Sequence, residues 1–318
     1  MMKMSKMFGL LLLMGVLATM PDVAQAEDFL TEAEEVQSKA EPVDEQYVEA
    51  DGWEKPIPFS FGIDYTLVSD YIFRGINFSE YAGEGREKPN HQLSVGGEVD
   101  LGEYGAVGGS VWFEWFAGQE SLTPNDSSNL QEVDYSAYWA YDFEQIYTSV
   151  ELGWIYYSFP RLSGDADATQ EWYVSLSFDD SFLFGTEESV LNPFFTLYHD
   201  FDDFGGYWME AGVSHDFAMA DMGMEDVMIL KDVTVTPSLT LGIDHRWVDE
   251  ALASGSPSTR LANLTYGMDV FYDLGSALEM PEQYGSIGIN GFLYYSQAFR
   301  DDVLNDEFYG GVTLSYGW

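Results

Sequence analysis

The chain has 318 residues, no cysteine, and 55 acidic against 12 basic side chains, which gives a formal net charge of −43 at pH 7. The lack of cysteine excludes a disulfide framework, a thiol enzyme and a cysteine metal site. The scarcity of Lys and Arg excludes a nucleic-acid partner, because phosphate binding requires basic side chains that replace counterions. Aromatic residues make up 16% of the chain, a share that is high for a soluble domain and suits a membrane β-barrel.

The first 26 residues have the features of a secretory signal peptide. Lys3 and Lys6 precede an uncharged apolar segment, Phe8 to Met20, and Ala-Gln-Ala follows at residues 24–26. The apolar segment is too short to cross a bilayer as a helix, which takes about 20 residues. We therefore predict that residues 1–26 are an export signal that is cleaved.

Residues 27–56 are strongly acidic and contain few large apolar side chains. Such a segment cannot bury enough apolar surface to fold, so we predict a disordered N-terminal extension in the periplasm. The simplest interpretation of its charge is a solvated tail without a function of its own. Residues 57–318 form the predicted folded domain.

From Phe59 the apolar residues follow a period of two, which places alternate side chains on opposite faces of a strand. The apolar phase continues through Tyr71 and Phe73, so the first strand is expected to reach Phe73. One face would meet lipid and the other would meet water. Eleven further segments show the same alternation, at residues 93–101, 107–115, 133–143, 150–156, 172–178, 191–197, 207–217, 233–247, 264–272, 287–295 and 308–318.

Twelve such segments predict an all-β fold, a transmembrane antiparallel up-and-down β-barrel of 12 strands. Each segment has roughly the ten residues that a tilted strand needs to cross a bilayer. The sheet must close, because lipid cannot satisfy the hydrogen bonds of a free edge. The alternative is a soluble β-sandwich or barrel with an aromatic core, which explains neither the repeated strand length nor the aromatic terminus.

Both termini of such a barrel lie on the same side, which we expect to be the periplasm. The connections on that side are two tight turns and three longer segments near residues 179–190, 218–232 and 273–283. On the other side, loops rich in Gly, Ser, Pro and Asp would face the exterior. Aromatic residues at the ends of strands predict an outer girdle at the membrane surface, formed by Tyr71, Trp115, Trp172, Tyr207, Trp247 and Tyr295.

The last strand carries apolar residues in a single phase and ends on an aromatic residue. Its phase is set by Phe308, Val312, Leu314, Tyr316 and Trp318. This pattern resembles the C-terminal targeting signal of bacterial outer-membrane β-barrels. The resemblance implies a Gram-negative outer membrane as location, outer-membrane lipid as surroundings, and the barrel-assembly machinery as a partner.

A second resemblance concerns residues 69–76, which read Ser-Asp-Tyr-Ile-Phe-Arg-Gly-Ile. They are similar to the opening motif of a family of bacterial outer-membrane porins, the TorF type. The motif covers eight residues. Beyond the motif the likeness consists of chain length, strand rhythm and glycine-rich hairpins. It implies a pore-like barrel and leaves the transported solute undefined.

The polar phase of the strands would line the lumen with many carboxylates and few basic side chains. Such a lining raises the local concentration of cations, so we expect passive diffusion of small solutes with a weak cation preference. The alternative is that the acidic side chains serve only to keep the lumen hydrated and that inward aromatic rings fill the bore. A closed or plugged barrel that works structurally or adhesively through its loops is therefore the alternative. The candidate lumen and constriction residues are Arg74, Trp112, Glu114, Asp134, Glu171, Trp208, Glu210, Asp244 and Arg246.

The sequence gives little support to catalysis or to a cofactor. Some outer-membrane barrels hydrolyse lipids with a His and a Ser two positions apart, and no histidine of this chain has that partner. We therefore expect no enzyme activity and no cofactor. Asp200, Asp202 and Asp203 form a weak calcium candidate at an outer bend, since carboxylate oxygens bind Ca²⁺. Their spacing matches no known calcium loop, and a solvated acidic turn is the alternative.

Overall fold

The structure is a computed structural model that describes residues 58–79, 89–116, 130–160, 167–252 and 258–318. The predicted signal peptide and acidic extension lie outside the described residues. Within these ranges, no helix has both the length and the apolar character that a membrane crossing requires.

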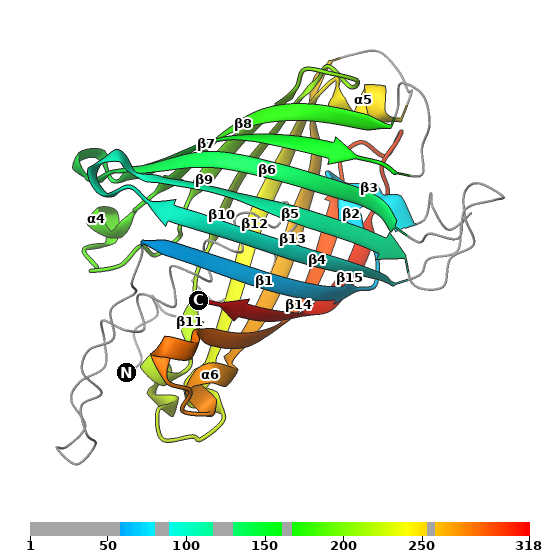
Figure 1. Ribbon diagram of the computed structural model, residues 1–318. Coiled ribbons are helices and arrows are strands. Elements are labelled where there is room, and N and C mark those ends of the chain that lie inside the picture. Colours follow the sequence, from blue (N-terminus) through cyan, green and yellow to red (C-terminus); the bar gives the residue numbers. More distant parts are fainter. Residues whose placement is uncertain (1–57, 80–88, 117–129, 161–166, 253–257) are drawn as a thin grey trace.

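Twelve long strands in the described part of the chain form one antiparallel barrel (Figure 1). Strands that follow each other along the chain are neighbours in the sheet, as the up-and-down prediction requires. The twelve are β1 (Phe59–Val68), β4 (Asn90–Asp100), β5 (Ala106–Phe116), β6 (Leu130–Phe143), β7 (Thr148–Ser158), β8 (Ala168–Phe178), β9 (Phe194–Asp200), β10 (Tyr207–Ser214), β12 (Val233–His245), β13 (Thr259–Asp273), β14 (Ser286–Ala298) and β15 (Glu307–Gly317).

The first and last strands close the barrel. In the register of β1 with β15, Ile63 lies opposite Tyr316 and Tyr65 lies opposite Leu314. The backbones of Phe61 and Trp318 exchange two hydrogen bonds of 2.9 Å each. On the far side of the barrel β10 pairs with β12, and the two-residue strand β11 (Phe217–Ala218) extends that pairing. The closed 12-stranded antiparallel barrel is thus confirmed.

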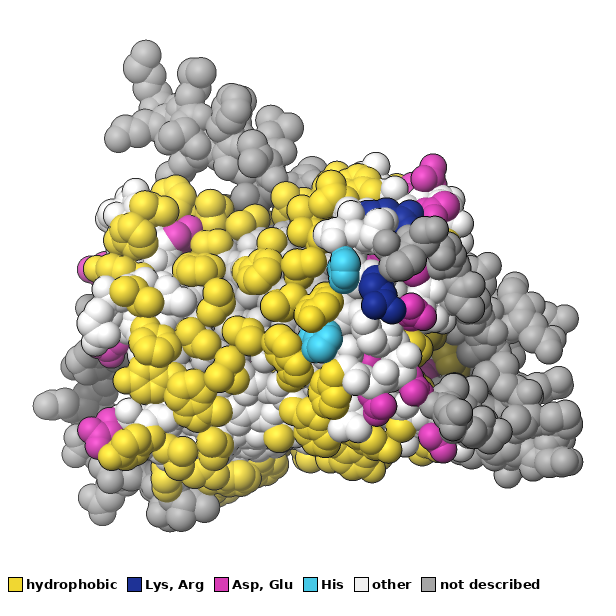
Figure 2. All heavy atoms as spheres, turned by 90° about the horizontal axis from the view of Figure 1, so that it is seen from above, with side chains coloured by type: hydrophobic (Ala, Val, Ile, Leu, Met, Phe, Trp, Pro, Cys, Tyr) yellow, Lys and Arg dark blue, Asp and Glu magenta, His cyan; other side chains and the backbone are white. Residues whose placement is uncertain are grey.

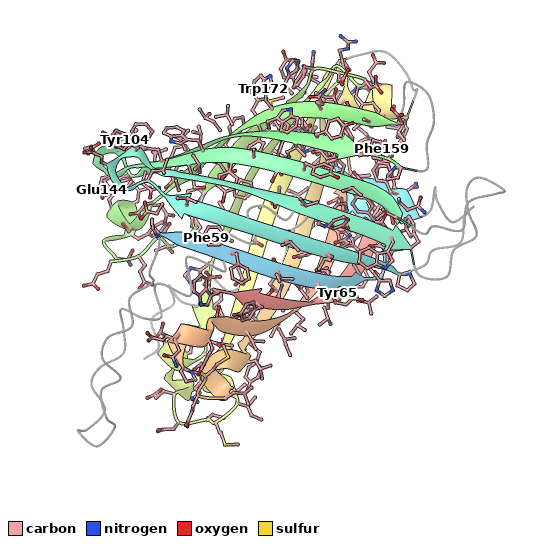
Figure 3. The ribbon with its side chains drawn as sticks, in the orientation of Figure 1. Phe59, Tyr65, Tyr104, Glu144, Phe159 and Trp172 are labelled. Atoms are coloured by element: carbon pink, nitrogen blue, oxygen red, sulfur yellow. The ribbon has the colours of Figure 1, made fainter. Side chains whose placement is uncertain are left out.

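The outer wall of the barrel is apolar. Val312 and Leu314, from the outward phase of β15, are 53% and 49% exposed. Apolar side chains cover much of the wall in Figure 2, and Tyr65 and Trp172 project from the barrel in Figure 3. A closed sheet that satisfies its own backbone and exposes apolar side chains is suited to lipid. The barrel is therefore transmembrane.

The two ends of the barrel differ in their connections. One end, here called the α6 end, holds the C-terminus (Figure 1) and Phe59 (Figure 3). It has two tight turns, η1 (Gly102–Tyr104) and η2 (Glu144–Ile146), as predicted. Its three longer connections also match the prediction, and they contain α4 (Ser181–Phe184), η3 (Ala220–Met224), η4 (Leu230–Asp232), α6 (Leu274–Ala277) and η5 (Glu282–Tyr284).

The opposite end, the α5 end, differs from the prediction in one important way. Strand β1 stops at Val68, and residues 69–79 fold as the short hairpin β2 (Ile72–Phe73) and β3 (Ile76–Asn77). Arg74 and Gly75 have φ angles of 53° and 80°, and this left-handed pair turns the chain back on itself. We call residues 69–79 the plug hairpin, because its side chains are buried among residues of the barrel wall.

Two aromatic residues predicted for the outer girdle therefore lie inside the barrel, and those predictions were wrong. Tyr71 belongs to the plug hairpin and packs against Trp112 of β5, with ring centroids 5.5 Å apart. Trp247 starts the helix α5 (Trp247–Ala251) and is only 3% exposed. The reason is that an apolar side chain at the end of a strand can be buried in lipid or against protein, and the alternation is the same in both cases.

Candidate functional site

The plug hairpin is fixed to the barrel wall by hydrogen bonds from both of its sides. The amide N of Ser69 donates to the carbonyl of Gly310 at 2.9 Å, and Asn77 Nδ2 donates to Glu307 Oε2 at 3.1 Å. Ser79 Oγ accepts from the amide N of Tyr71 at 2.7 Å and from Asn90 Nδ2 at 3.2 Å. These bonds hold the hairpin in one place, with Arg74 at its tip.

Arg74 forms a bidentate ion pair with Glu171 of β8. The distances are 3.0 Å from Nη1 to Oε2 and 2.8 Å from Nη2 to Oε1. The side chains of Arg74 and Glu171 are 1% and 0% exposed. The hydroxyl of Tyr157 in β7 also donates to Glu171 Oε1. Paired N–H groups that meet both oxygens of a carboxylate fix both the position and the orientation of the guanidinium.

Four aromatic rings surround the same guanidinium. Its Cζ lies 4.5 Å from the ring centroid of Trp247, 4.7 Å from Phe73 and from Tyr198, and 5.9 Å from Trp208. Distances within about 6 Å permit cation–π attraction. Burial by itself would lower the pKa of Arg74, but the charge of Glu171 outweighs it and raises that pKa above its ordinary value. Arg74 is therefore a charged side chain at the tip of the plug hairpin.

A second buried carboxylate faces this cluster. Trp208 Nε1 donates to Glu210 Oε1 at 2.7 Å. The other oxygen, Glu210 Oε2, has no hydrogen-bond partner among the described residues. The ring of Trp208 lies 5.9 Å from Arg74 Cζ, so Trp208 connects Glu210 to this cluster. The site therefore holds two buried carboxyl groups for one guanidinium.

Acidic side chains also gather around Tyr71 at the base of the plug hairpin. In the register of β5 with β6, Trp112 lies opposite Asp134 and Glu114 lies opposite Glu132. All four side chains are buried. Burial raises the pKa of Tyr71 well above its usual range, and the charges of Glu132, Asp134 and Glu114 raise it further. Tyr71 is therefore an uncharged hydroxyl beside a strongly acidic part of the wall.

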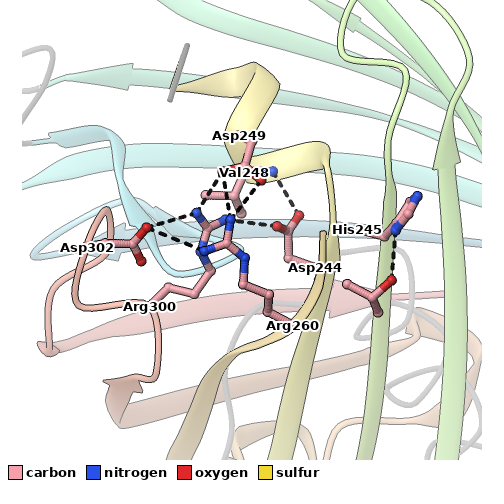
Figure 4. Close-up of polar contacts among 8 residues, drawn as sticks. Asp244, His245, Val248, Asp249, Arg260, Arg300 and Asp302 are labelled. Carbon is pink, nitrogen blue, oxygen red and sulfur yellow. Dashed lines mark hydrogen bonds and ion pairs between the residues drawn. The ribbon is translucent and has the colours of Figure 1, made fainter. Parts of the chain in front are cut away.

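Arg300 is the centre of a second ion-pair cluster, shown in Figure 4. Its Nη1 lies 2.9 Å from Asp244 Oδ2 in β12, and its Nη2 lies 2.7 Å from Asp249 Oδ1 in α5. Asp302 lies 3.4 Å from Nη2. Arg260 of β13 contacts Asp249 and Asp302 at 3.4 and 3.5 Å. The cluster joins α5 to the wall and to the connection between β14 and β15.

The structure brings most of the predicted lumen residues together. Arg74, Trp112, Glu114, Asp134, Glu171, Trp208, Glu210 and Asp244 are all buried inside the barrel. Arg246 differs: its side chain is 44% exposed and pairs with Glu250 at 3.0 Å. Arg300, which was not predicted, is the buried arginine that pairs with Asp244. Its only sequence signal is a lone basic residue after an apolar strand and before Asp301 and Asp302.

The calcium candidate has a different role in the structure. Asp200 Oδ1 accepts hydrogen bonds from the amide N of Asp202, Phe204 and Gly205 at 3.0 to 3.2 Å, and Oδ2 accepts from Thr169 Oγ1 at 2.7 Å. Across the described ranges, no group of three or more His, Asp or Glu side chains is arranged to hold a metal ion. Asp200 therefore organises the turn between β9 and β10.

The α6 half of the lumen is more accessible than the half that contains the plug hairpin. Its carboxylates Asp64, Glu98 and Asp269 are partly exposed. Tyr138 donates to Glu98 at 3.0 Å, and Tyr294 donates to Asp269 at 3.0 Å. Small polar side chains of β5 and β6 share the lumen-facing phase, including the pair Ser110 and Ser136, whose hydroxyls are 2.8 Å apart. The lumen thus has one half with partly exposed carboxylates and another half that the plug hairpin fills.

The four histidines lie away from this site. Tyr65 contacts His91 Nδ1 at 2.6 Å, and the ring of His199 stacks on Tyr207 with centroids 4.1 Å apart. His245 Nδ1 lies 2.8 Å from Thr259 Oγ1, and His215 Nδ1 contacts the carbonyl of Val190. None of these contacts joins a histidine to a serine hydroxyl.

Comparison with known proteins gives only architectural likeness. No family model matches the chain, and no curated protein matches it. Among solved structures, a KdgM porin covers 80% of this chain and 98% of its own, at 13% identity and a TM-score of 0.42. A NanC porin gives the same coverage at 11% identity and a TM-score of 0.43. An outer-membrane channel from Pseudomonas putida F1 covers 86% of this chain and all of its own, at 6% identity and a TM-score of 0.46.

Proposed function

We propose that the chain is an outer-membrane porin through which small solutes diffuse passively, with a weak preference for cations. The observation that carries this proposal is the charge of the lumen. Asp64, Glu98 and Asp269 are partly exposed in the α6 half, while Arg74 and Arg300, the buried arginines among the described residues, are paired with carboxylates. An unbalanced acidic lining attracts cations and repels anions.

The proposal includes an orientation in the membrane. The α6 end would face the periplasm, with residues 27–56 as an acidic extension that remains after cleavage of residues 1–26. The apolar phase of β15, which includes Phe308 and Trp318, would be recognised by the barrel-assembly machinery. The resemblance of residues 69–76 to the TorF-type motif also supports a porin.

The plug hairpin favours a second candidate function. Because Arg74 and its aromatic neighbours fill part of the α5 half, the barrel is either a narrow pore or a closed structural barrel that works through its loops. Barrels with packed interiors conduct poorly. The two candidates differ in whether ions pass the plug hairpin.

Conductance in planar bilayers separates these candidates. The purified, refolded barrel is expected to give stable current steps. In an asymmetric KCl gradient, the sign of its reversal potential is expected to indicate a preference for cations. Silence from barrel whose fold is verified by circular dichroism and heat-modifiable gel mobility would favour the closed structural barrel. A reversal potential of the opposite sign would disprove the cation preference while leaving the pore in place.

A further inference from the structure

The guanidinium of Arg74 lies in a receptor-like site that the barrel wall builds around it. Of the groups that contact it, only Phe73 belongs to the plug hairpin. Glu171, Tyr198, Trp208 and Trp247 come from β8, β9, β10 and the start of α5. We call these four residues, together with Glu210, the guanidinium cage. Four of the five cage residues belong to strands of the wall and Trp247 belongs to α5, so none of them is part of the plug hairpin.

The chemistry of the cage is specific for one type of cation. Glu171 receives two N–H groups side by side, and Tyr198 and Trp247 offer ring faces at 4.7 and 4.5 Å. A planar guanidinium satisfies both requirements at once, whereas an ammonium group is a point charge that cannot form the paired contact. A neutral planar molecule has the shape but not the charge that aromatic faces and carboxylates attract.

The cage also contains a second carboxyl group, that of Glu210, whose hydrogen-bond donor Trp208 lies against Arg74. Glu171 and Glu210 are both buried, and Glu210 Oε2 has no hydrogen-bond partner in the described part of the chain. A second, independent feature thus indicates that the cage is suited to a cation with further N–H donors. Arg74 fills the site with its guanidinium and leaves this carboxylate oxygen unused.

From this arrangement we infer that the guanidinium cage is a binding site for small guanidinium-type organic cations, and that Arg74 is a tethered occupant with which such solutes compete. The role of the cage as the recognition site of a pore rests on the proposed function. A tethered group competes at an effective concentration of about a millimolar or more, so free solutes bind the wild-type cage weakly. Removal of the Arg74 side chain exposes the site.

Binding is tested with methylguanidinium chloride as the probe and the detergent-folded, full-length barrel. In Arg74→Ala, methylguanidinium is expected to raise the unfolding temperature saturably, with an apparent affinity roughly tenfold or more above that of the wild type. Methylurea, which is neutral and of similar shape, and NaCl at equal ionic strength are expected to have no such effect. Arg246→Ala is the matched control, because it removes an exposed arginine outside the cage.

Two further variants keep the test decisive. Arg74→Ala/Glu171→Gln is expected to bind methylguanidinium about tenfold more weakly than Arg74→Ala, because the paired contact then lacks a charged acceptor. If Arg74→Ala does not fold, Arg74→Gln is used for the same titration. An equal response to methylurea, or no response to methylguanidinium in any folded Arg74 variant, would overturn the inference.

Bilayer recordings distinguish failure of this inference from failure of the proposed function. If the wild-type barrel and Arg74→Ala both conduct KCl, methylguanidinium is expected to reduce the K⁺ current through Arg74→Ala at concentrations that leave the wild-type current unchanged. KCl conductance that methylguanidinium does not alter in either barrel would refute the cage and leave the porin intact. Saturable binding to a barrel that never conducts would refute the porin and leave the cage as a binding site.

Discussion

Arg74 and Glu171 lie 97 residues apart in the sequence and form a bidentate ion pair inside the barrel. One belongs to the tip of the plug hairpin and the other to β8, so the pair ties an inserted segment to the wall. Both charges are removed from water, and their mutual contact compensates for the lost hydration. The pair is therefore one of the contacts that hold the plug hairpin in the lumen.

Glu171→Gln is expected to destabilise the barrel by about 3–5 kcal/mol, because it leaves the buried Arg74 charge without its charged partner. Unfolding by urea in lipid vesicles, followed by tryptophan fluorescence, measures the change. The double variant Arg74→Leu/Glu171→Leu removes both charges and is expected to recover most of the lost stability. Glu250→Gln is the surface control, since its pair with Arg246 is exposed at both ends and contributes little. Equal effects of Glu171→Gln and Glu250→Gln would contradict the role given to the buried pair.

Arg300→Met is expected to loosen α5 from the wall. The substitution leaves Asp244 and Asp249 without the guanidinium that joins them, while it keeps much of the side-chain volume. Amide hydrogen exchange in residues 247–251 should become at least about tenfold faster, because local opening of α5 then costs less free energy. Arg260→Met serves as the control, as Arg260 is partly exposed and contacts Asp249 at a longer 3.4 Å. Unchanged exchange in Arg300→Met would show that other contacts hold α5.

Asp180 is expected to make a pH-dependent contribution to stability at the α6 end. Burial opposes its ionisation, but hydrogen bonds from Ser189 Oγ and from the amides of Val190 and Leu191 outweigh it and lower the pKa of Asp180. A lowered folded-state pKa stabilises the fold above the unfolded-state value, near 3.9, and this stabilisation is lost as pH falls through the folded-state pKa. Asp180→Asn should therefore cost about 1–3 kcal/mol at pH 7 and much less near pH 3.

The measurement is the urea midpoint of Asp180→Asn relative to that of the wild type. This difference is determined at pH 7 and again at pH 3, and the two differences are compared. Asp226→Asn, at an exposed position of a neighbouring connection, is the control and should change stability little at pH 7. A difference for Asp180→Asn that grows as the pH is lowered would contradict the sign of the argument.

Neutralisation of the partly exposed lumen acids is expected to weaken the cation preference. Glu98→Gln/Asp269→Asn keeps the shape of both side chains and removes two negative charges from the α6 half of the lumen. The reversal potential in a KCl gradient should move toward zero, because the local excess of cations falls with the wall charge. Glu144→Gln, at the turn after β6 (Figure 3), removes a charge outside the lumen and should leave the potential unchanged. Equal shifts in both variants would mean that the surface charge, and not the charge of the lumen, sets the reversal potential.

Val312→Arg tests the assignment of the apolar face of β15 to lipid. A charged side chain near the bilayer midplane destabilises a barrel by about 2–4 kcal/mol and less near the interfaces. The loss should appear in vesicle unfolding experiments as a lower urea midpoint. Leu278→Arg, in the exposed connection after α6, is the control and should be tolerated. Tolerance of Val312→Arg would mean that this face does not meet lipid.

The local pattern of the sequence was sufficient to predict the wall of the barrel. The period-two alternation predicted the twelve strands, which side of each strand faces the lumen, and the three long connections at the α6 end. It also placed Trp112, Glu114, Glu171 and Glu210 inside. These features follow from a single local requirement, that one side of each strand avoids water and the other does not.

Only the tertiary structure determines that residues 69–79 fold as the plug hairpin inside the barrel. The alternation through Tyr71 and Phe73 reports that these rings avoid water, but it cannot distinguish lipid from the packed interior of the barrel. The choice depends on Trp112, Tyr157, Tyr198 and Trp208, which are distant in the sequence and form an apolar site only when the sheet closes. The partners of Arg74 and Arg300 were hidden for the same reason, since ion pairs across a barrel depend on closure and leave no local pattern.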